Sequence, residues 1–205
     1  MAFLTQQEKE QLRQAIADAE STTTAEIVTV IAASSDDYHY IPVLWAALLA
    51  LTVPGIHFLL GEPLSAVLIY QVQVLVFFAV TLLLQTKALR SKVIPKRVRH
   101  RRAALAAREQ FLTLNLHSTA ERNAVMIYVS VAEHYVEILT DIGVAERIDN
   151  QVWQATVARF VEHVKAGNTF DGFMAAVSDC RTQLSTHFPA SGRNPNELTD
   201  HLVEL

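Results

Sequence analysis

The stretch IPVLWAALLALTVPGIHFLL, residues 41–60, contains no Asp, Glu, Lys or Arg. A second uncharged stretch, LSAVLIYQVQVLVFFAVTLLL at residues 64–84, follows after only Gly61-Glu62-Pro63. About 20 apolar residues in a helix are enough to cross about 30 Å of hydrocarbon. We therefore predict two membrane-spanning helices, and the three-residue connection predicts that they form an antiparallel hairpin.

Two helices buried in the core of a soluble protein would have a similar composition. Half of the chain is hydrophobic (51%) and only 19% is charged. However, a chain of 205 residues can rarely surround two fully apolar helices on all sides. The membrane hairpin is therefore the favoured interpretation.

Positive charge is concentrated directly after the second apolar stretch. Nine of the seventeen Lys and Arg residues lie between residues 87 and 108, where no Asp or Glu occurs, although the net charge of the chain is −4. Because Lys and Arg are enriched on the cytoplasmic flanks of membrane spans, we predict that both termini are cytoplasmic. We call the following residues the basic collar and expect them to contact anionic lipid headgroups: Lys87, Arg90, Lys92, Lys96, Arg97, Arg99, Arg101 and Arg102.

Nucleic acid is the usual partner of a basic segment, but we do not expect it here. No aromatic residue that could stack on bases is interleaved with these cations, and the chain contains no nucleic-acid-binding motif.

Three polar residues occur inside the apolar stretches: His57, Gln71 and Gln73. Polar groups in hydrocarbon either mark a transport pathway or form hydrogen bonds within or between helical hairpins. Because the two stretches contain no acidic residue and no second His, the hydrogen-bonding role is favoured over a transport role.

The remaining segments alternate between helix and strand patterns. Thr5 and Glu8 form a capping box for a helix over about residues 5–20, and the apolar run 26–33 predicts a strand covered on both faces. After the hairpin, we predict a helix from Pro95 to about Leu116, with Val98, Leu105, Phe111 and Leu112 as core contacts. Two strands, 125–131 and 135–140, should form a β-hairpin, and apolar stripes predict helices over 153–164 and 170–184.

This order, α-β-(span-span)-α-β-β-α-α, predicts a small α/β sandwich with a mixed sheet and an inserted transmembrane hairpin. The first two strands should be parallel with a right-handed crossover, and the third should pair antiparallel to the second. The predicted divisions are a first half of a cytoplasmic domain (1–40), the hairpin (41–84), a second half (85–188) and a flexible tail (189–205), in which Leu198, Leu202 and Leu205 could form a short docking helix.

Several segments together resemble one protein family: AEIVTV (25–30), SSDDYHYIPVLWAALLAL (34–51), REQFLTLNLHST (108–119), VMIYVSVAEHYVEILTD (125–141) and DCRTQLSTHFP (179–189). They resemble the TPM domain family, in particular its bacterial branch with a two-helix membrane insertion. The family is named after a thylakoid-lumen acid phosphatase, a photosystem II repair protein and a nematode receptor modulator. The resemblance therefore implies a fold and a cell-surface or membrane role more directly than one reaction. Together with the two predicted spans, it leads us to expect a location in the bacterial inner (plasma) membrane.

One departure from the family bears on catalysis. Many TPM domains follow the third strand with a glycine-rich turn and with acidic residues that bind a divalent ion. Here Glu137 occupies a position where the family carries Glu, but the strand continues as YVEILTDIGVAERI. The glycine-rich turn is missing, so no metal ligand of the family is transferred to this chain.

A candidate metal site nevertheless follows from the predicted topology. Sites in open α/β sheets lie beyond the carboxyl ends of parallel strands, where this chain carries Asp36, Asp37, Glu133 and His134. Together these residues could bind Mg²⁺ or Ca²⁺ and leave positions open for a phosphate. The alternative, which we favour, is that the two Asp residues cap the strand end and that Glu133-His134 is a solvated turn.

The leading functional hypothesis is a membrane-anchored module that supports assembly or quality control of an unidentified membrane protein. The rival is a divalent-metal-dependent phosphatase, an acid-phosphatase-like hydrolase with the four residues above. A component of a transporter or channel is disfavoured, because two spans without charge make a poor pathway unless the chain forms a homo-oligomer.

Overall fold

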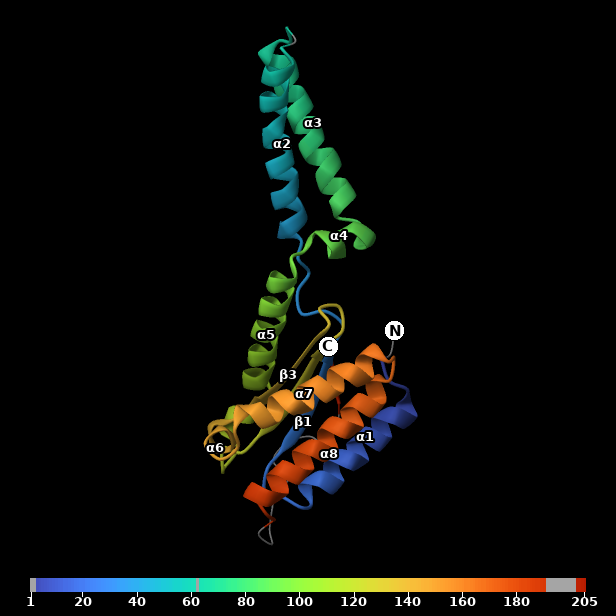
Figure 1. Ribbon diagram of the computed structural model, residues 1–205, viewed down its shortest axis with the longest axis vertical. Coiled ribbons are helices and arrows are strands. Elements are labelled where there is room, and N and C mark those ends of the chain that lie inside the picture. The colour runs from blue at the N-terminus through green and yellow to red at the C-terminus, as the bar shows by residue number, and fades with distance from the viewer. Residues whose placement is uncertain (1–2, 62, 191–201) are drawn as a thin grey trace. The chain divides into compact units, whose positions relative to one another are not determined.

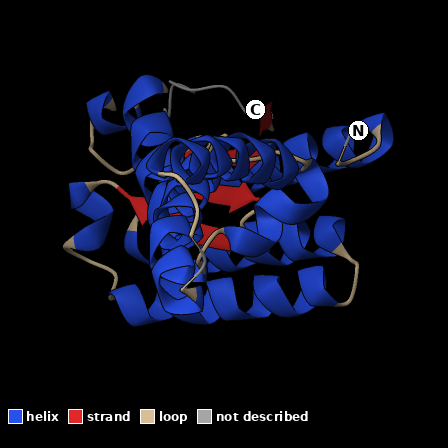
Figure 2. Cartoon of the chain, turned by 90° about the horizontal axis from the view of Figure 1, so that it is seen from above, coloured by secondary structure: helices blue, strands red, loops and turns tan. Residues whose placement is uncertain are grey.

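The computed structural model describes residues 3–61, 63–190 and 202–205. The chain divides into two compact units: Met1–Ser35 together with His100–Leu205, and Asp36–Arg99. Figure 1 labels their elements along the chain, and Figure 2 distinguishes the helices from the strands.

The first unit is built on a mixed sheet with strand order β3-β2-β1-β4. Strand β1 (Ile27–Ala32) pairs in parallel with β2 (Val125–Ser130), and β2 pairs antiparallel with β3 (Tyr135–Thr140). This confirms the predicted mixed α/β fold and the predicted direction of each of these three strands. Every residue of β1 and β2 is buried, as expected for strands that are covered on both faces.

The fourth strand corrects one expectation. The last residues of the chain form β4 (Val203–Glu204) instead of a short helix, and β4 pairs in parallel with β1. The amide of Leu205 donates to the carbonyl of Ile31 at 2.9 Å, and the amide of Ala33 donates to the carbonyl of Leu205 at 2.8 Å. The outer edge of β1 has backbone N–H and C=O groups that need hydrogen-bond partners. A strand can pair with them, whereas a helix uses its own backbone groups internally. Of the predicted flexible tail, 189–205, residues 191–201 lie outside the described residues.

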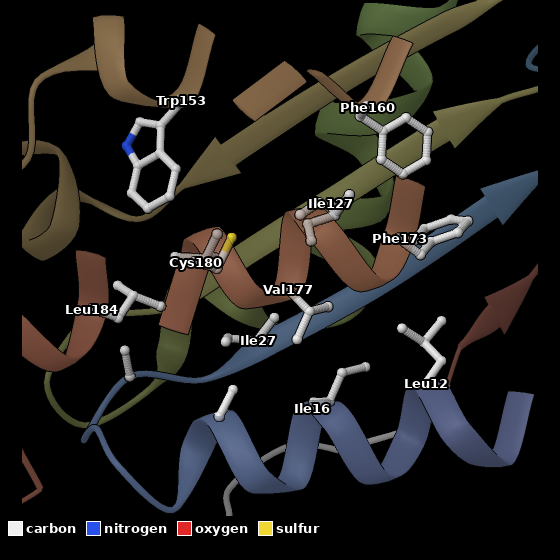
Figure 3. Close-up of a cluster of buried hydrophobic side chains, with 14 of the residues drawn as sticks. Leu12, Ile16, Ile27, Ile127, Trp153, Phe160, Phe173, Val177, Cys180 and Leu184 are labelled. Carbon is white, nitrogen blue, oxygen red and sulfur yellow. The ribbon is translucent and has the colours of Figure 1, made fainter. Parts of the chain in front are cut away.

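Three helices cover one face of the sheet: α1 (Gln6–Glu20), α7 (Asn150–Lys165) and α8 (Thr169–His187). Helix α1 begins at the predicted capping box, in which Thr5 and Glu8 bond to each other. Figure 3 shows side chains from α1, β1 and α8 converging in this core, including Ile16, Ile27 and Val177. The rings of Phe160 and Phe173 meet edge to face with centroids 5.0 Å apart.

Helix α5 (Lys96–Thr113) supplies the core on the other face of the sheet, and the 3-10 turn η1 (Leu116–Ser118) follows it. The buried residues of α5 recur every four positions: Ala103, Ala107 and Phe111. The prediction that Leu105 and Leu112 are core contacts was wrong, because they are 44% and 57% exposed. Because the small residues Ala103 and Ala107 face the sheet, α5 lies close to it. Leu105 and Leu112 lie on the other side of the helix and therefore point outward.

The second unit consists of α2 (Tyr40–Leu60), α3 (Ala66–Leu84) and α4 (Lys87–Val93). Figure 1 shows α2 and α3 side by side as an antiparallel pair, so the predicted helical hairpin is confirmed. Gly61 ends α2 with φ 69°, a left-handed conformation that glycine adopts without strain. Both helices are long and apolar enough to cross a membrane. The short helix α4 was not predicted.

Candidate functional site

The carboxylate of Glu133 lies at the carboxyl ends of β1 and β2, where the sequence predicted a site. This residue is only 2% exposed. Its Oε1 accepts a hydrogen bond from Ser34 Oγ at 3.1 Å. Its Oε2 accepts one from the amide of Ser35 at 3.1 Å and another from Ser130 Oγ. Protein donors therefore occupy both oxygens and replace the water that a buried carboxylate would lose.

A chain of hydroxyl groups extends this network into the sheet. Ser35 Oγ donates to Ser130 Oγ at 2.7 Å and lies 3.0 Å from the hydroxyl of Tyr128. Because a serine hydroxyl carries a single proton, Tyr128 must be the donor to Ser35. Burial is the main factor that raises the pKa of Tyr128, and the charge of Glu133 adds to it, so the phenol remains a donor at neutral pH.

This arrangement joins the end of β1 to the turn between β2 and β3. His134 is exposed in that turn and adopts a left-handed backbone with φ 51°, a conformation in which His is enriched. Three donors fill most of the lone-pair positions of this carboxylate, so a metal ion at Glu133 would compete with them. The geometry therefore fits a structural role for Glu133 better than a reactive one.

The other two residues of the predicted metal site belong to the second unit. Asp36 Oδ1 accepts a hydrogen bond from the amide of Tyr38 at 3.3 Å, which closes an Asx turn at the start of this unit. Asp37 is exposed. Among the described residues, no group of three or more His, Cys, Asp or Glu side chains is arranged to hold a metal ion. Because the four residues are divided between the two units, their convergence stays a prediction.

A second polar group lies on the outer strand β3. Tyr135 donates its hydroxyl to Glu137 Oε2 at 2.8 Å, and the ring of His100 meets that of Tyr135 edge to face at 5.4 Å. Burial first, and then the hydrogen bond to Glu137, raise the pKa of Tyr135. Glu137 is the residue that matches a Glu of the family. Its carboxylate therefore accepts a hydrogen bond from Tyr135, which lies on the same face of β3.

Cys180, a candidate nucleophile in the first unit, lies in the core with 0% exposure. Burial raises the pKa of its thiol to about 12. At neutral pH the thiolate form is therefore negligible, and a thiol needs that form to act as a nucleophile.

The hairpin places its polar residues in different environments. Gln71 is exposed, whereas Gln73 and His57 are half-buried. The Nδ1 of His57 is buried without a hydrogen-bond partner among the described residues. The predicted intramembrane polar residues therefore do not form one cluster.

The base of the hairpin is tied together by polar contacts. His39 Nδ1 lies 3.3 Å from Gln85 Oε1 and 3.4 Å from Nη1 of Arg90. Trp45 donates its indole N–H to the carbonyl of Val93 at 3.2 Å, which links α2 to the end of α4. Tyr40 and Trp45 are 54% and 42% exposed near this end of α2. Exposed Tyr and Trp at a helix end are typical of a membrane–water interface.

The residues of the basic collar follow the hairpin on α4 and α5. The side chain of Lys87 lies outside the described part of the structure, and Arg90 and Arg99 are half-buried. The other five are exposed: Lys92, Lys96, Arg97, Arg101 and Arg102. Exposed cations directly after an apolar helix are suited to contact a negatively charged surface.

Comparison with known proteins supports the resemblance seen in the sequence. Residues 93–183 match the family model described as the TPM domain, so the resemblance to that family is confirmed.

Among solved structures, the chain is similar to the NMR structure of the BA42 protein from the psychrophilic bacterium Bizionia argentinensis. The TM-score is 0.62 at 18% sequence identity, and the match covers 99% of this chain and 96% of BA42. At this identity the similarity establishes the fold alone. No curated protein matches the chain.

Proposed function

We propose that this protein is a TPM-like domain anchored in a bacterial inner (plasma) membrane by two spans, with both termini in the cytoplasm. It acts as an interaction module that supports the assembly or quality control of a membrane protein. The anionic lipid headgroups and the membrane protein are its two partners.

The main support for this proposal is that α2 and α3 are almost fully exposed in the structure. Among the 18 most apolar consecutive residues of each helix, 11% are buried in α2 and none in α3. Core helices of a soluble protein are mostly buried, so this chain does not itself cover the two helices. A bilayer would remove their side chains from water, and the lengths of 21 and 19 residues suit its hydrocarbon thickness.

The charge pattern supports the orientation. The connection at the tip of the hairpin, residues 61–65, carries no Lys or Arg, whereas the basic collar follows the other end of α3. This asymmetry favours a cytoplasmic location for the collar and hence for the first unit.

The outer face of α5 supports a binding role. Leu105 and Leu112 are exposed and lie seven residues apart, so they project from the same side of the helix. The exposed cations Arg101, Arg102 and Arg108 lie on the same helix. Such a mixture of apolar and cationic side chains suits an apolar, negatively charged partner surface.

A divalent-metal-dependent phosphatase is the second candidate. It is favoured by the position of Glu133 and His134 at the carboxyl ends of the parallel strands β1 and β2, the usual location of ligand sites in such sheets. Mg²⁺ or Ca²⁺ would be bound by these two residues together with Asp36 and Asp37. The donors that already occupy Glu133 weigh against it.

The interaction role is tested by photo-crosslinking in intact cells that express the full chain. A photoreactive residue replaces Leu105 in one variant and the exposed Thr182 of α8 in a control. We expect light-dependent adducts with an integral membrane protein from position 105 and none from position 182. Absence of such adducts from position 105, in cells that contain the folded protein, would overturn the proposed interaction role.

A further inference from the structure

The exposed side of helix α3 includes a stripe along its middle that the described residues do not cover. The stripe consists of Leu68, Gln71, Leu75, Phe78 and Leu82, and other exposed residues such as Val67, Val72 and Leu83 flank it. Their spacing alternates between three and four residues, so at about 100° per residue the five side chains stay within about 80° of the helix circumference. The half-buried residues Ile69, Gln73, Val76 and Val80 lie on the opposite side of α3, which contacts α2.

One member of this stripe is polar. The amide of Gln71 is exposed and has no hydrogen-bond partner among the described residues, whereas the stripe residues around it are Leu and Phe. If α3 spans a membrane, as the proposed function requires, this amide faces hydrocarbon, in which water is not available as a partner. A side-chain amide in such a position is costly unless another helix pairs with it.

A second copy of the chain is the occupant that fits this stripe. Copies in one membrane share one orientation, so two α3 helices related by a two-fold axis along the membrane normal run parallel. Each residue of the stripe then meets the same residue of the other copy. A Gln side chain carries both donors and an acceptor, and two such amides can therefore pair with each other.

The alternating spacing supports the same geometry. Residues spaced three and four apart form the seam of left-handed parallel helix pairs, and one polar residue in such a seam fixes the register of the two helices. We propose that the protein forms a parallel dimer through the α3 stripe of two copies, with the two Gln71 amides hydrogen-bonded across the interface. This inference rests on the proposed membrane anchoring.

The first test compares two neighbouring positions at nearly the same depth. Leu82 lies in the stripe and is 76% exposed, whereas Leu83 lies outside it and is 57% exposed. Single variants Leu82→Cys and Leu83→Cys of the full chain are oxidised in native membranes with copper phenanthroline. The natural Cys180 has 0% exposure and serves as an internal background. We expect a disulfide-linked dimer from position 82 at several times the yield from position 83.

The second test removes the amide. Gln71→Leu should lower the association constant about three- to tenfold, the size expected for one or two hydrogen bonds between membrane helices. Gln73→Leu is the matched control, because Gln73 lies on the α2 side of the same helix. Association is measured by energy transfer between labelled full-length chains in vesicles at increasing dilution in lipid.

The outcomes separate the two proposals. If the chain is absent from the membrane fraction, the proposed anchoring fails and the dimer fails with it. If the chain is membrane-inserted but positions 82 and 83 crosslink equally, or not at all, the dimer is overturned and the anchoring stands. Crosslinking of position 82 to a different protein alone would also overturn the dimer.

Discussion

Arg122 and Asp141 form a two-pronged ion pair that joins the segment before β2 to the segment after β3. Arg122 Nε donates to Asp141 Oδ2 at 2.6 Å, and its Nη2 donates to Oδ1 at 2.9 Å. Oδ1 of Asp141 also accepts the amide of Ile142 at 2.8 Å and so caps the short helix α6 (Ile142–Ala145). Asp141 is 5% exposed, so the pair is shielded from solvent on the carboxylate side.

This pair should make the first unit sensitive to acid. Burial raises the pKa of Asp141, but the hydrogen bonds and charge of Arg122 and the amide of Ile142 outweigh it, so the pKa lies below its usual value of 3.8. The stabilisation is therefore complete above pH 3.8 and is lost as the pH falls through the lower, folded-state value.

We expect Asp141→Asn to lower the free energy of unfolding by about 1–3 kcal/mol at pH 7 and to have a smaller effect at acid pH. Thermal unfolding of the full chain in detergent at several pH values measures this. The exposed Glu146 provides the control Glu146→Gln. An equal loss at pH 7 and at pH 3 would contradict the role assigned to the charge.

Gly143 should not tolerate a side chain. A Cβ at this position would lie 2.7 Å from the carbonyl oxygen of Arg122 and 3.0 Å from that of Glu121. Because both atoms belong to the backbone, relief requires the segment before β2 to move, and we expect Gly143→Ala to cost about 1–3 kcal/mol of stability. Gly55, with no atom within 4 Å of a built Cβ, is the control. Equal unfolding temperatures for the two alanine variants would show that the segment yields without cost.

Strand β4 should stabilise the edge of the sheet through its backbone. Leu205→Pro removes the amide that donates to Ile31, whereas Leu205→Ala keeps that amide and changes only a side chain that is 48% exposed. We expect the proline variant to lose about 1–3 kcal/mol and the alanine variant much less. Urea unfolding of both variants provides the comparison, and similar losses would mean that the side chain, and not the strand pairing, matters.

Because Glu133 already accepts several hydrogen bonds, we expect the protein to bind divalent ions only weakly. Calorimetric titration of the full chain in detergent with Mg²⁺, Ca²⁺ and Mn²⁺ should show no micromolar binding, because Ser34, Ser35 and Ser130 already satisfy this carboxylate. Micromolar binding that the double change Asp36→Asn, Asp37→Asn abolishes would favour the phosphatase over the interaction module.

The fold of the first unit could largely be predicted from local patterns. Capping at Thr5, the two-sided apolar run of β1 and the short turn between β2 and β3 each act over a few residues. The crossover from β1 to β2 and that short turn then fix the strand directions. Strand β4 could not be predicted, because two residues carry no periodicity and their pairing with β1 depends on contacts across most of the chain. The outward orientation of Leu105 was missed because the pattern of α5 suggested leucines, and not alanines, as its buried side.

The polar network around Glu133 was only partly foreseen. The sequence singled out Glu133, because it follows a strand end, but the favoured interpretation as part of a solvated turn was wrong, since Glu133 is 2% exposed. The roles of Ser35, Ser130 and Tyr128 were not predicted. Ser130 is a polar residue at the end of an apolar strand, which is a detectable signal. Its pairing with Ser35 could not be inferred, since it depends on how β1 and β2 are placed side by side.

The most direct test of membrane anchoring is the labelling of engineered cysteines in intact cells with a membrane-impermeant maleimide. Pro63→Cys at the tip of the hairpin and Ala190→Cys after α8 both place the thiol at exposed positions, while Cys180 is buried. The proposed topology predicts that position 63 reacts in spheroplasts and that position 190 reacts only after the cells are lysed. Labelling of position 190 before lysis would contradict this topology. Recovery of the protein in the soluble fraction, with neither position labelled before lysis, would contradict membrane anchoring.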